Sequence, residues 1–328
     1  MMFKTELTEK LGIEYPIVQA GMGGVAMAEL VAAVSNAGGL GVIGAAILTP
    51  DSLREEVRKV KDLTDKPFAV DLLLAQGWPG QDEMIKVMIE EGVPVFASGL
   101  GSPAPYAEEM HGAGMTIMAV IGAVRHARRV VEGGTDIVVA QGTEGGGHTG
   151  RIATVALVPQ VVDAVAPVPV VAAGGIADGR GLVAALALGA CGVWVGTRFV
   201  ATKEAFGHDN YKRKIVEATE EGTVVTRAFT GKDCRVIKNR YAEQWEDRQG
   251  ELKPFPFQMM VDSAKMDAAV IHGQTDLGIM PAGQISGAIH EVKSAGDVVR
   301  EMMEEAEEVL ARLAEKHPST SLRTGLEL

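Results

Sequence analysis

The sequence predicts an α/β protein built on a closed (β/α)8 barrel, or TIM barrel, with a smaller second lobe inserted before the last helix. Short apolar, β-branched runs alternate with helical patterns through the first two-thirds of the chain, and eight such runs fit within about 200 residues. Runs that are apolar on both faces suit a parallel sheet covered on both sides. Two doubly wound domains would give the same alternation, but eight units in this length favour a closed barrel.

The expected strands coincide with the apolar runs, and each is followed by a helix or a loop. The strands are expected at 17–20, 40–43, 68–72, 93–97, 115–119, 136–140, 168–172 and 192–195. Helices are expected at 26–36, 50–63, 82–91, 104–112, 124–131, 155–165 and 180–188, with a Glu-rich amphipathic helix at 294–315.

The pattern changes after residue 202, where charged and aromatic residues become more frequent. We interpret residues 203–283 as a lid or substrate lobe over the barrel mouth. The alternative is a decorated connection before the last helix. The expected organisation is therefore a barrel of residues 1–202 with 284–317, a lobe of residues 203–283, and a flexible tail at 318–328.

Composition excludes several classes of partner and location. A net charge of −12 argues against nucleic acid and anionic membranes, which bind basic surfaces. Two cysteines, Cys191 and Cys234, cannot form a disulfide framework, and this suits a reducing cytoplasm. The chain shows no secretory signal or apolar stretch long enough to span a bilayer. No cluster has metal-ligand spacing, so no metal is predicted.

The loops after the last two predicted strands indicate a phosphate site. Gly174-Gly175 follows the seventh strand, and Gly196-Thr197 follows the eighth. Glycine turns that lead into helices expose backbone N–H groups, and these loops are the usual phosphate site of such barrels. The alternative is two tight turns in which glycine serves geometry alone.

The loop after the sixth strand, residues 141–150, is the strongest single feature. It holds five glycines, which let the backbone lie against a flat or phosphorylated ligand, and His148 projects from it. Histidine titrates near neutral pH, so His148 is the candidate catalytic acid or base. The alternative is a histidine that only hydrogen-bonds a phosphate or caps the next helix.

Two further strand ends carry candidate ligand contacts. Gly21-Met22 follows the first strand, and Met22 would pack either on a planar ring or in the core. Asp71 closes the third strand. The first helix lacks the Gly-x-Gly-x-x-Gly opening, so a separate nicotinamide-binding domain is not expected.

Taken together, these motifs resemble the nitronate monooxygenase (2-nitropropane dioxygenase) family, which also contains FMN-dependent enoyl-acyl-carrier-protein reductases and NADH:quinone reductases. The matching segments cover nearly the whole chain and are 12–17, 21–22, 36–41, 141–148, 173–180, 196–199 and 282–284.

The resemblance implies FMN as cofactor and His148 as the active-site histidine, beside the substrate and the reactive nitrogen of the flavin. Gly21 and Met22 would lie at the flavin ring, while Asp71 stands where many members have asparagine. The implied cofactor contacts are Ala20, Gly21, Met22, Asp71, Gln141, Gly146, Gly147, Gly174, Gly175, Gly196 and Thr197.

The resemblance is mixed below the family level. Residues 226–231, 238–241 and 254–258 resemble the monooxygenases, whereas 97–119 and 279–284 resemble the enoyl reductases. Three functions follow in order of preference.

The first is oxidation of alkyl nitronates by O2, with Arg198 and Arg227 either attracting the anion or pairing structurally. The second is NAD(P)H-dependent reduction of an enoyl thioester or a quinone. The third is a flavin-free barrel that binds a phosphate ligand. The substrate is a small molecule in each case, and a homodimer is compatible with the sequence.

Overall fold

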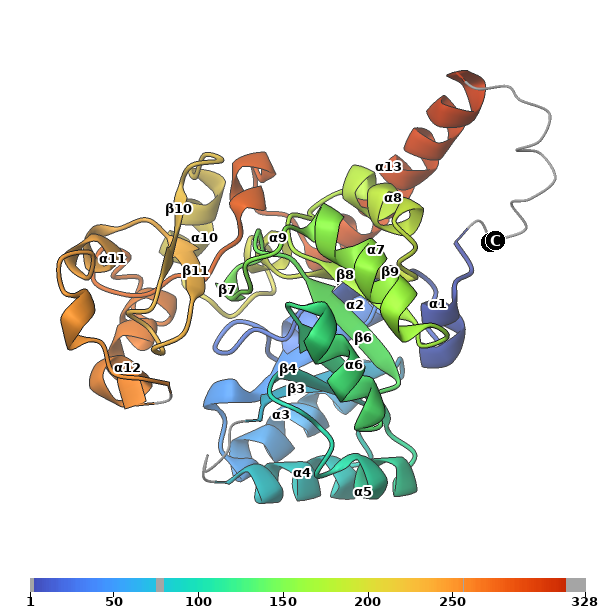
Figure 1. Cartoon of the computed structure of the whole chain (residues 1–328), viewed down its shortest axis with the longest axis horizontal. Coiled ribbons are helices and arrows are strands. Elements are labelled where there is room, and N and C mark those ends of the chain that lie inside the picture. The colour runs from blue at the N-terminus through green and yellow to red at the C-terminus, as the bar shows by residue number, and fades with distance from the viewer. Residues whose placement is uncertain (1–2, 75–79, 256, 317–328) are drawn as a thin grey trace.

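The fold is described by a computed structural model that covers residues 3–74, 80–255 and 257–316. Eight parallel strands form one sheet in the order β1-β9-β8-β6-β5-β4-β3-β2, and helices surround it (Figure 1). The strands are β1 (Ile17–Gln19), β2 (Gly41–Gly44), β3 (Phe68–Leu73), β4 (Val95–Leu100), β5 (Thr116–Ile121), β6 (Ile137–Gln141), β8 (Val170–Ala173) and β9 (Gly192–Val195).

The barrel closes where β1 meets β2. Their direct pairing is one bridge between Val18 and Leu40, in which the Gln19 N–H donates to the Leu40 carbonyl at 2.9 Å. The fully buried Gln19 side chain extends this seam. Its Oε1 accepts from the Val42 N–H at 3.0 Å, and its Nε2 donates to the Val42 carbonyl at 3.2 Å. A side-chain amide thus takes the place of a further backbone pair.

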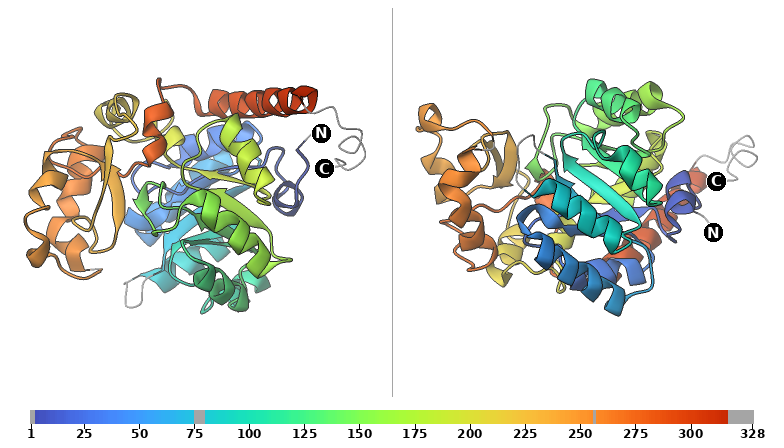
Figure 2. Two further views of the ribbon diagram at one scale, coloured as in Figure 1. Left: turned by 45° about the horizontal axis from the view of Figure 1, so that its top comes forward. Right: turned by 90° about the horizontal axis from the view of Figure 1, so that it is seen from below.

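Side chains alternate between the inside and the outside of the barrel because each strand has a period of two. The inner cluster includes Val18, Val42, Ala69, Val139 and Trp194. Leu7 belongs to the same cluster and is fully buried. It comes from α1 (Glu6–Leu11), a short helix that begins at a Thr5 capping box. Helix α1 therefore covers the end of the barrel opposite the lobe (Figure 2).

The helices of the outer ring bury their apolar faces against the strands. Helix α3 shows how the sequence sets one boundary: the Thr49 hydroxyl accepts from the Ser52 N–H, and Pro50 occupies the first turn. The ring consists of α2 (Ala28–Asn36), α3 (Pro50–Leu63), α4 (Gln81–Glu90), α5 (Ala107–Gly112), α6 (Val124–Glu132), α7 (Thr154–Val165), α8 (Gly179–Ala187) and α13 (Ala295–Lys316).

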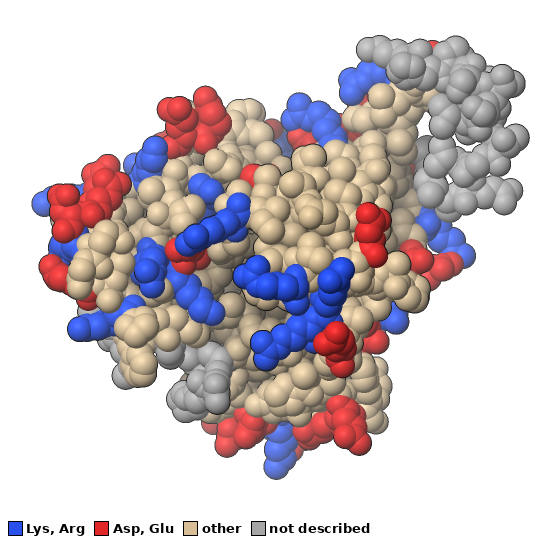
Figure 3. Space-filling view, viewed as in Figure 1, with Lys and Arg blue, Asp and Glu red and all other residues tan. Residues whose placement is uncertain are grey.

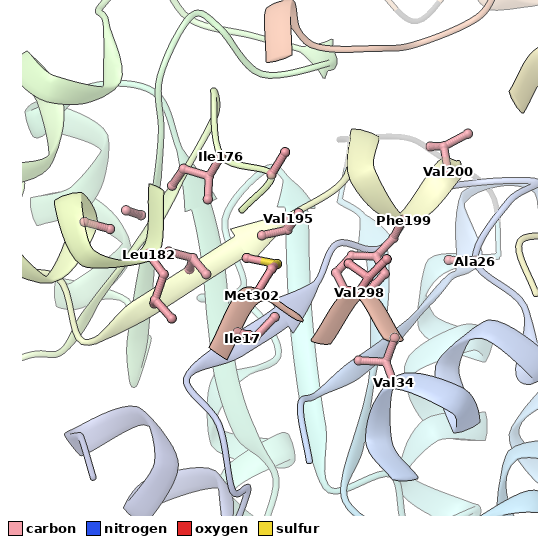
Figure 4. Packing of buried hydrophobic residues seen from close by; sticks show 14 of the residues in the cluster. Ile17, Ala26, Val34, Ile176, Leu182, Val195, Phe199, Val200, Val298 and Met302 are labelled. Atoms are coloured by element: carbon pink, nitrogen blue, oxygen red, sulfur yellow. The ribbon is translucent and has the colours of Figure 1, made fainter. Parts of the chain in front are cut away.

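Helix α13 completes this ring although it lies far along the chain. Val298 and Met302 of α13 pack among residues of β1, α2 and α8, including Ile17, Val34 and Leu182 (Figure 4). All five side chains are at most 2% exposed. Burial of an aliphatic side chain of this size is worth about 1.5–3 kcal/mol, so α13 contributes substantially to the stability of the barrel.

The segment between β9 and α13 forms a separate group of elements at one end of the barrel (Figure 2). Ala228, Val236, Tyr241, Trp245 and Ile279 belong to a small hydrophobic cluster of its own. The elements are α9 (Thr197–Val200), α10 (Asp209–Val216), β10 (Thr223–Thr226), β11 (Cys234–Ile237), α11 (Arg240–Gln244), α12 (Phe257–Val270) and the 3-10 helix η3 (Gln284–Ala288).

The predicted barrel is confirmed, and its eight strands and eight outer helices lie within a few residues of their predicted positions. Asp71 does not close β3, because the strand continues to Leu73. The division into a barrel, a lobe at 203–283 and a tail stays an interpretation, and the tail at 318–328 lies outside the described residues. No helix in the described part of the chain is long and apolar enough to cross a bilayer.

The seam at Gln19 gives a stability prediction. Gln19→Leu leaves the buried N–H and carbonyl of Val42 without these partners, at a cost of about 1–3 kcal/mol for each group. We expect the free energy of unfolding, measured by urea denaturation, to fall by about 2–4 kcal/mol. The control is Gln160→Leu, on the exposed face of α7, which should change it by less than about 0.5 kcal/mol. Equal effects of the two substitutions would contradict the role of the seam.

Candidate active site

A cavity of about 210 Å³ opens at the carboxyl ends of the barrel strands. The strand-end loops supply most of its wall, and the segment after β9 adds Tyr211, Phe229, Thr230 and Met266. Neither lysine nor arginine lines this cavity among the described residues. It is therefore a largely apolar space in which polar contacts come from backbone groups and a few side chains.

All the site residues predicted from the sequence line this one cavity. They are Ala20, Gly21, Met22, Asp71, Gln141, Gly146, Gly147, His148, Gly174, Gly175, Gly196 and Thr197. Sequence reasoning missed Gly44, Gly99, Glu144 and Thr230, which also line it. Gly44 and Gly99 could have been found from the alternation of β2 and β4, whereas nothing local marks Thr230.

Close backbone packing explains two of the glycines. A Cβ on Gly44 would lie 2.3 Å from the backbone of Met22, so glycine is required where β2 passes the first loop. A Cβ on Gly146 would lie 2.7 Å from the backbone of Ala282 and Gly283. These glycines therefore let chain segments far apart in sequence meet at the wall of the cavity.

The loop after β6 is fixed from two sides. Within the loop, Gln141 Nε2 donates to the His148 carbonyl at 2.6 Å. The Glu144 carboxylate accepts from the Thr154 N–H at 3.0 Å, at the start of α7. The two-residue strand β7 (Gly147–His148) pairs antiparallel with Cys234 and Arg235 of β11. The segment after β9 thus holds the backbone of His148 directly.

The predicted phosphate loops also meet at this cavity. Gly174 and Gly175 both have positive φ, of 95° and 73°, which favours glycine. Thr197 Oγ1 accepts from the Gly283 N–H at 2.9 Å, which leaves the hydroxyl proton of Thr197 available to a ligand. The sequence predicted a ligand contact for Thr197, and in the fold it also anchors the segment before η3.

His148 is the titratable group most strongly affected by the site. Burial, with a smaller contribution from the charge of Lys232, lowers its pKa to about 4, so the ring is neutral at physiological pH. Its Nε2 lies 2.8 Å from Thr230 Oγ1. The backbone N–H of Lys232 donates to the same oxygen at 3.3 Å. When the Thr230 hydroxyl donates to Nε2, the ring proton sits on Nδ1.

Phe255 and Lys232 complete the surroundings of the histidine. The Phe255 ring meets His148 edge to face with centroids 6.1 Å apart. Lys232 Nζ lies 4.5 Å from the centre of the same phenylalanine ring. The neutral His148 ring therefore lies near the positive charge of Lys232. Among the described contacts, the Lys232 ammonium group does not donate a hydrogen bond to the ring.

A second, more open hollow of about 1260 Å³ begins at His148 and runs along α6. Gln141, Val120 and Gly99 line both spaces, so the groove adjoins the cavity. We call this hollow the basic groove, because the side chains of Arg125, Arg129, Arg151, Arg227 and Lys232 line it. Figure 3 shows Lys and Arg gathered over the same face of the barrel.

Most of these cations have no acidic partner. Arg151 approaches Asp233 at 3.5 Å, whereas no ion pair joins Arg125, Arg129, Arg227 or Lys232 to a carboxylate of the described residues. The charges of Arg125, Arg129 and Lys232 add to desolvation in lowering the pKa of His126. Unpaired cations gathered in a chain of net charge −12 indicate an anionic ligand.

The two arginines suggested for substrate attraction have different roles. Arg198 is buried and donates to the carbonyls of Glu291 at 3.0 Å and Ala201 at 3.1 Å, so it supports the fold. Arg227 donates from Nε to the Gly231 carbonyl at 3.0 Å and also lines the basic groove. Only Arg227 is placed to meet a ligand.

A family model described as nitronate monooxygenase matches residues 4–305. The chain belongs to this family. Membership makes the protein an oxidoreductase, and the nitronate monooxygenase family is flavin-dependent. The family resemblance predicted from the sequence is therefore confirmed.

Relatives of this nitronate monooxygenase family member carry different names. It is 36% identical to a probable nitronate monooxygenase of Staphylococcus haemolyticus, covering 87% of this chain and 92% of that one. It is also 36% identical to (3aS,4S,5R,7aS)-5-hydroxy-7a-methyl-1-oxo-octahydro-1H-indene-4-carboxyl-CoA dehydrogenase of Mycobacterium tuberculosis, covering 93% and 97%. The structure of FabK from Thermotoga maritima matches with a TM-score of 0.90 and 40% identity, covering 96% and 99%.

Proposed function

We propose that this protein is an FMN-dependent oxidoreductase that oxidises alkyl nitronates with O2 at His148. The observation that carries the proposal is the cavity itself. Every strand-end group that the family resemblance assigns to the cofactor faces one largely apolar space, and the neutral His148 lies at its opening. A buried planar ring needs such walls, with few polar groups to fix its orientation.

The residues present fit FMN. Glycines at the end of β8 and β9 leave room for a phosphate beside backbone N–H groups. Gly175, Gly196 and Thr197 would hold that phosphate, which explains how the cavity manages without lysine or arginine. Gly21, Met22 and Gln141 would contact the ring or its side chain. When bound, FMN supplies the electron transfer between substrate and O2.

His148 would orient the substrate. A nitronate already carries a negative charge and needs no base to form it, so a neutral ring that donates from Nδ1 suits its oxygens. Lys232 would attract the anion, because its positive charge acts at His148. Its ammonium group lies over the Phe255 ring and leaves the His148 ring free to bind the substrate. The segment after β9 would exclude water from this contact through Phe229 and Thr230.

The basic groove favours a second candidate function, the NAD(P)H-dependent reduction of an acyl thioester. A small nitronate would fill only the end of the groove beside His148, whereas the unpaired arginines of α6 lie farther along it. The tail of a coenzyme A thioester carries several phosphates, and one relative is named as a CoA thioester dehydrogenase. The acyl group would then reach His148, which lines the groove as well as the cavity.

We also propose that the protein works in the cytoplasm. Cys191 and Cys234 are free thiols. Burial raises the pKa of both to about 12, which keeps the thiols protonated and unreactive. The oxidoreductase would meet NAD(P)H and reduced conditions there.

The first prediction concerns the flavin and its electron donor. The purified protein should be yellow with an FMN spectrum, and anaerobic propionate-3-nitronate should bleach it rapidly. Bleaching by NADH but not by the nitronate would favour the thioester or quinone function instead. A colourless protein that binds no added FMN would contradict both and leave the flavin-free barrel.

The second prediction concerns His148. His148→Ala should retain FMN, because the loop is held by backbone pairing to β11 and by Gln141. Its kcat/KM should fall by at least about a hundredfold, because the substitution removes a side chain that would contact the reacting atoms. His111→Ala, at an exposed position paired with Asp136, is the control and should keep wild-type turnover. Equal turnover of the two variants would reduce His148 to a structural role.

The third prediction separates the two substrates. Arg125→Ala and Arg129→Ala should each raise KM for an acyl-CoA by about tenfold, because each removes a charge-assisted contact to phosphate. KM for a nitronate should change less than about twofold. The matched control is Arg128→Ala, on the same helix but outside the groove, which should leave both values unchanged. An unchanged KM for acyl-CoA in the first two variants would contradict the second candidate function.

A further inference from the structure

Asp71 places a carboxyl group within the barrel lumen, and the proposed function does not explain why this residue is an acid. It follows Ala69 by two residues on β3, so both point inward, and Asp71 is 8% exposed. In the sheet it stands opposite Gly44 on β2 and Ala97 on β4. The carboxyl therefore lies in the last interior layer, at the floor of the cavity.

Two glycines make room for this carboxyl group. A Cβ on Gly21 would lie 2.6 Å from Asp71 Oδ2, and a Cβ on Gly99 would lie 2.7 Å from Oδ1. A backbone hydrogen bond from Gly99 also reaches the carboxyl. Any larger residue at position 21 or 99 would displace the Asp71 carboxyl, so the two glycines make room for it.

The carboxyl has no charge partner among the residues that the structure describes. Gly21, Gly44, Ala97 and Gly99, on the elements packed against it, carry no titratable group. The titratable side chains elsewhere in the cavity wall are Glu144, His148 and Tyr211.

None of these three groups supplies a counter-ion. Glu144 is itself acidic and binds Thr154, His148 is neutral at physiological pH, and burial keeps Tyr211 protonated by raising its pKa.

One oxygen of the group lacks a partner altogether. Asp71 Oδ1 is buried and makes no hydrogen bond. Burial raises the pKa of Asp71 to about 7, because desolvation outweighs the Gly99 hydrogen bond. A buried polar atom without a partner, at the edge of a cavity, indicates that a ligand group completes its hydrogen bonding.

We propose that Asp71 binds FMN in its carboxylic acid form and donates its proton in a hydrogen bond to the flavin. This inference rests on the proposed function, and it gives Asp71 the role of a hydrogen-bond donor to the flavin. An ionised carboxylate could only accept a hydrogen bond from the flavin, and no cation would offset the cost of burying its charge.

The proton balance of FMN binding then depends on pH. Below neutrality the free protein already holds the proton, and FMN binds without a change in protonation. Above neutrality the free protein carries a carboxylate, and each FMN bound takes up one proton from solvent. The affinity for FMN should therefore fall by about tenfold for each pH unit above the pKa of the free group.

The experiment measures FMN release from the holoenzyme. The full-length holoenzyme is diluted at pH 7.5 and 8.5, and FMN fluorescence reports the dissociation constant. The phosphate of FMN is already doubly ionised over this range, so it adds no proton of its own. We expect the wild-type Kd to rise by about tenfold between the two pH values.

Variants separate the carboxyl from other groups. Asp71→Asn cannot ionise and keeps a donor, so its Kd should change less than about twofold over the same range. If it does not fold, Asp71→Ser removes the ionisable group equally. Asp62→Asn, at an exposed position on α3, is the control and should keep the wild-type tenfold rise.

The outcomes are distinct. A wild-type Kd that is independent of pH, or that falls as pH rises, overturns this inference alone, because FMN is still bound. A variant at position 71 that keeps the wild-type pH dependence overturns it as well. A protein that binds no FMN at either pH overturns the proposed function and this inference with it.

Discussion

The closure of the barrel between β1 and β2 is the constraint on which the site depends. A single bridge and the Gln19 amide join these strands. Closure brings the loop after β1 so near to β2 that only glycine fits at position 44, against the backbone of Met22. Position 44 stands opposite Asp71 in the sheet. One polar seam thus sets the floor of the cavity, and an open sheet of the same strands would have no such floor.

The second constraint is the pairing of β7 with β11. It joins a loop of the barrel to a segment that follows all eight barrel strands, and it fixes the backbone of His148. The side chain of His148 meets Thr230 from the same segment. The barrel therefore supplies the cofactor cavity, while the later segment determines where the histidine lies at its opening.

Family membership leaves the substrate open because relatives of similar identity carry the names of different reactions. The two spaces at His148 offer a physical explanation. The cavity is built from strand ends that a closed barrel fixes, whereas the groove depends on exposed arginines of α6 and on loops that change without disturbing the core. Under the proposed function, replacement of surface side chains of the groove would change the substrate without disturbing the barrel.

The sequence predicted the barrel and a set of residues that line one cavity, because both depend on local patterns. Strand alternation places Asp71 and Gln141 inside, and glycine doublets mark the loops after β8 and β9. The sequence did not indicate Thr230, since it meets His148 across 82 residues of chain. Gln19, a polar residue at the end of an apolar strand, was a visible signal, but the seam it completes is a tertiary feature. The sequence analysis did not single out the arginines of α6, and the fold shows that Arg125 and Arg129 line the same groove as His148.

The place of α13 in the chain affects how the protein is made. The ribosome synthesises β9 about 100 residues before α13. At 5–20 residues per second, the interval between them is roughly 5–20 s. During this interval α13 is not yet present to cover Ile17, Val34 and Leu182. A nascent chain with such an apolar strip is a substrate for chaperones that bind hydrophobic surface, and slower translation of the lobe would prolong that dependence.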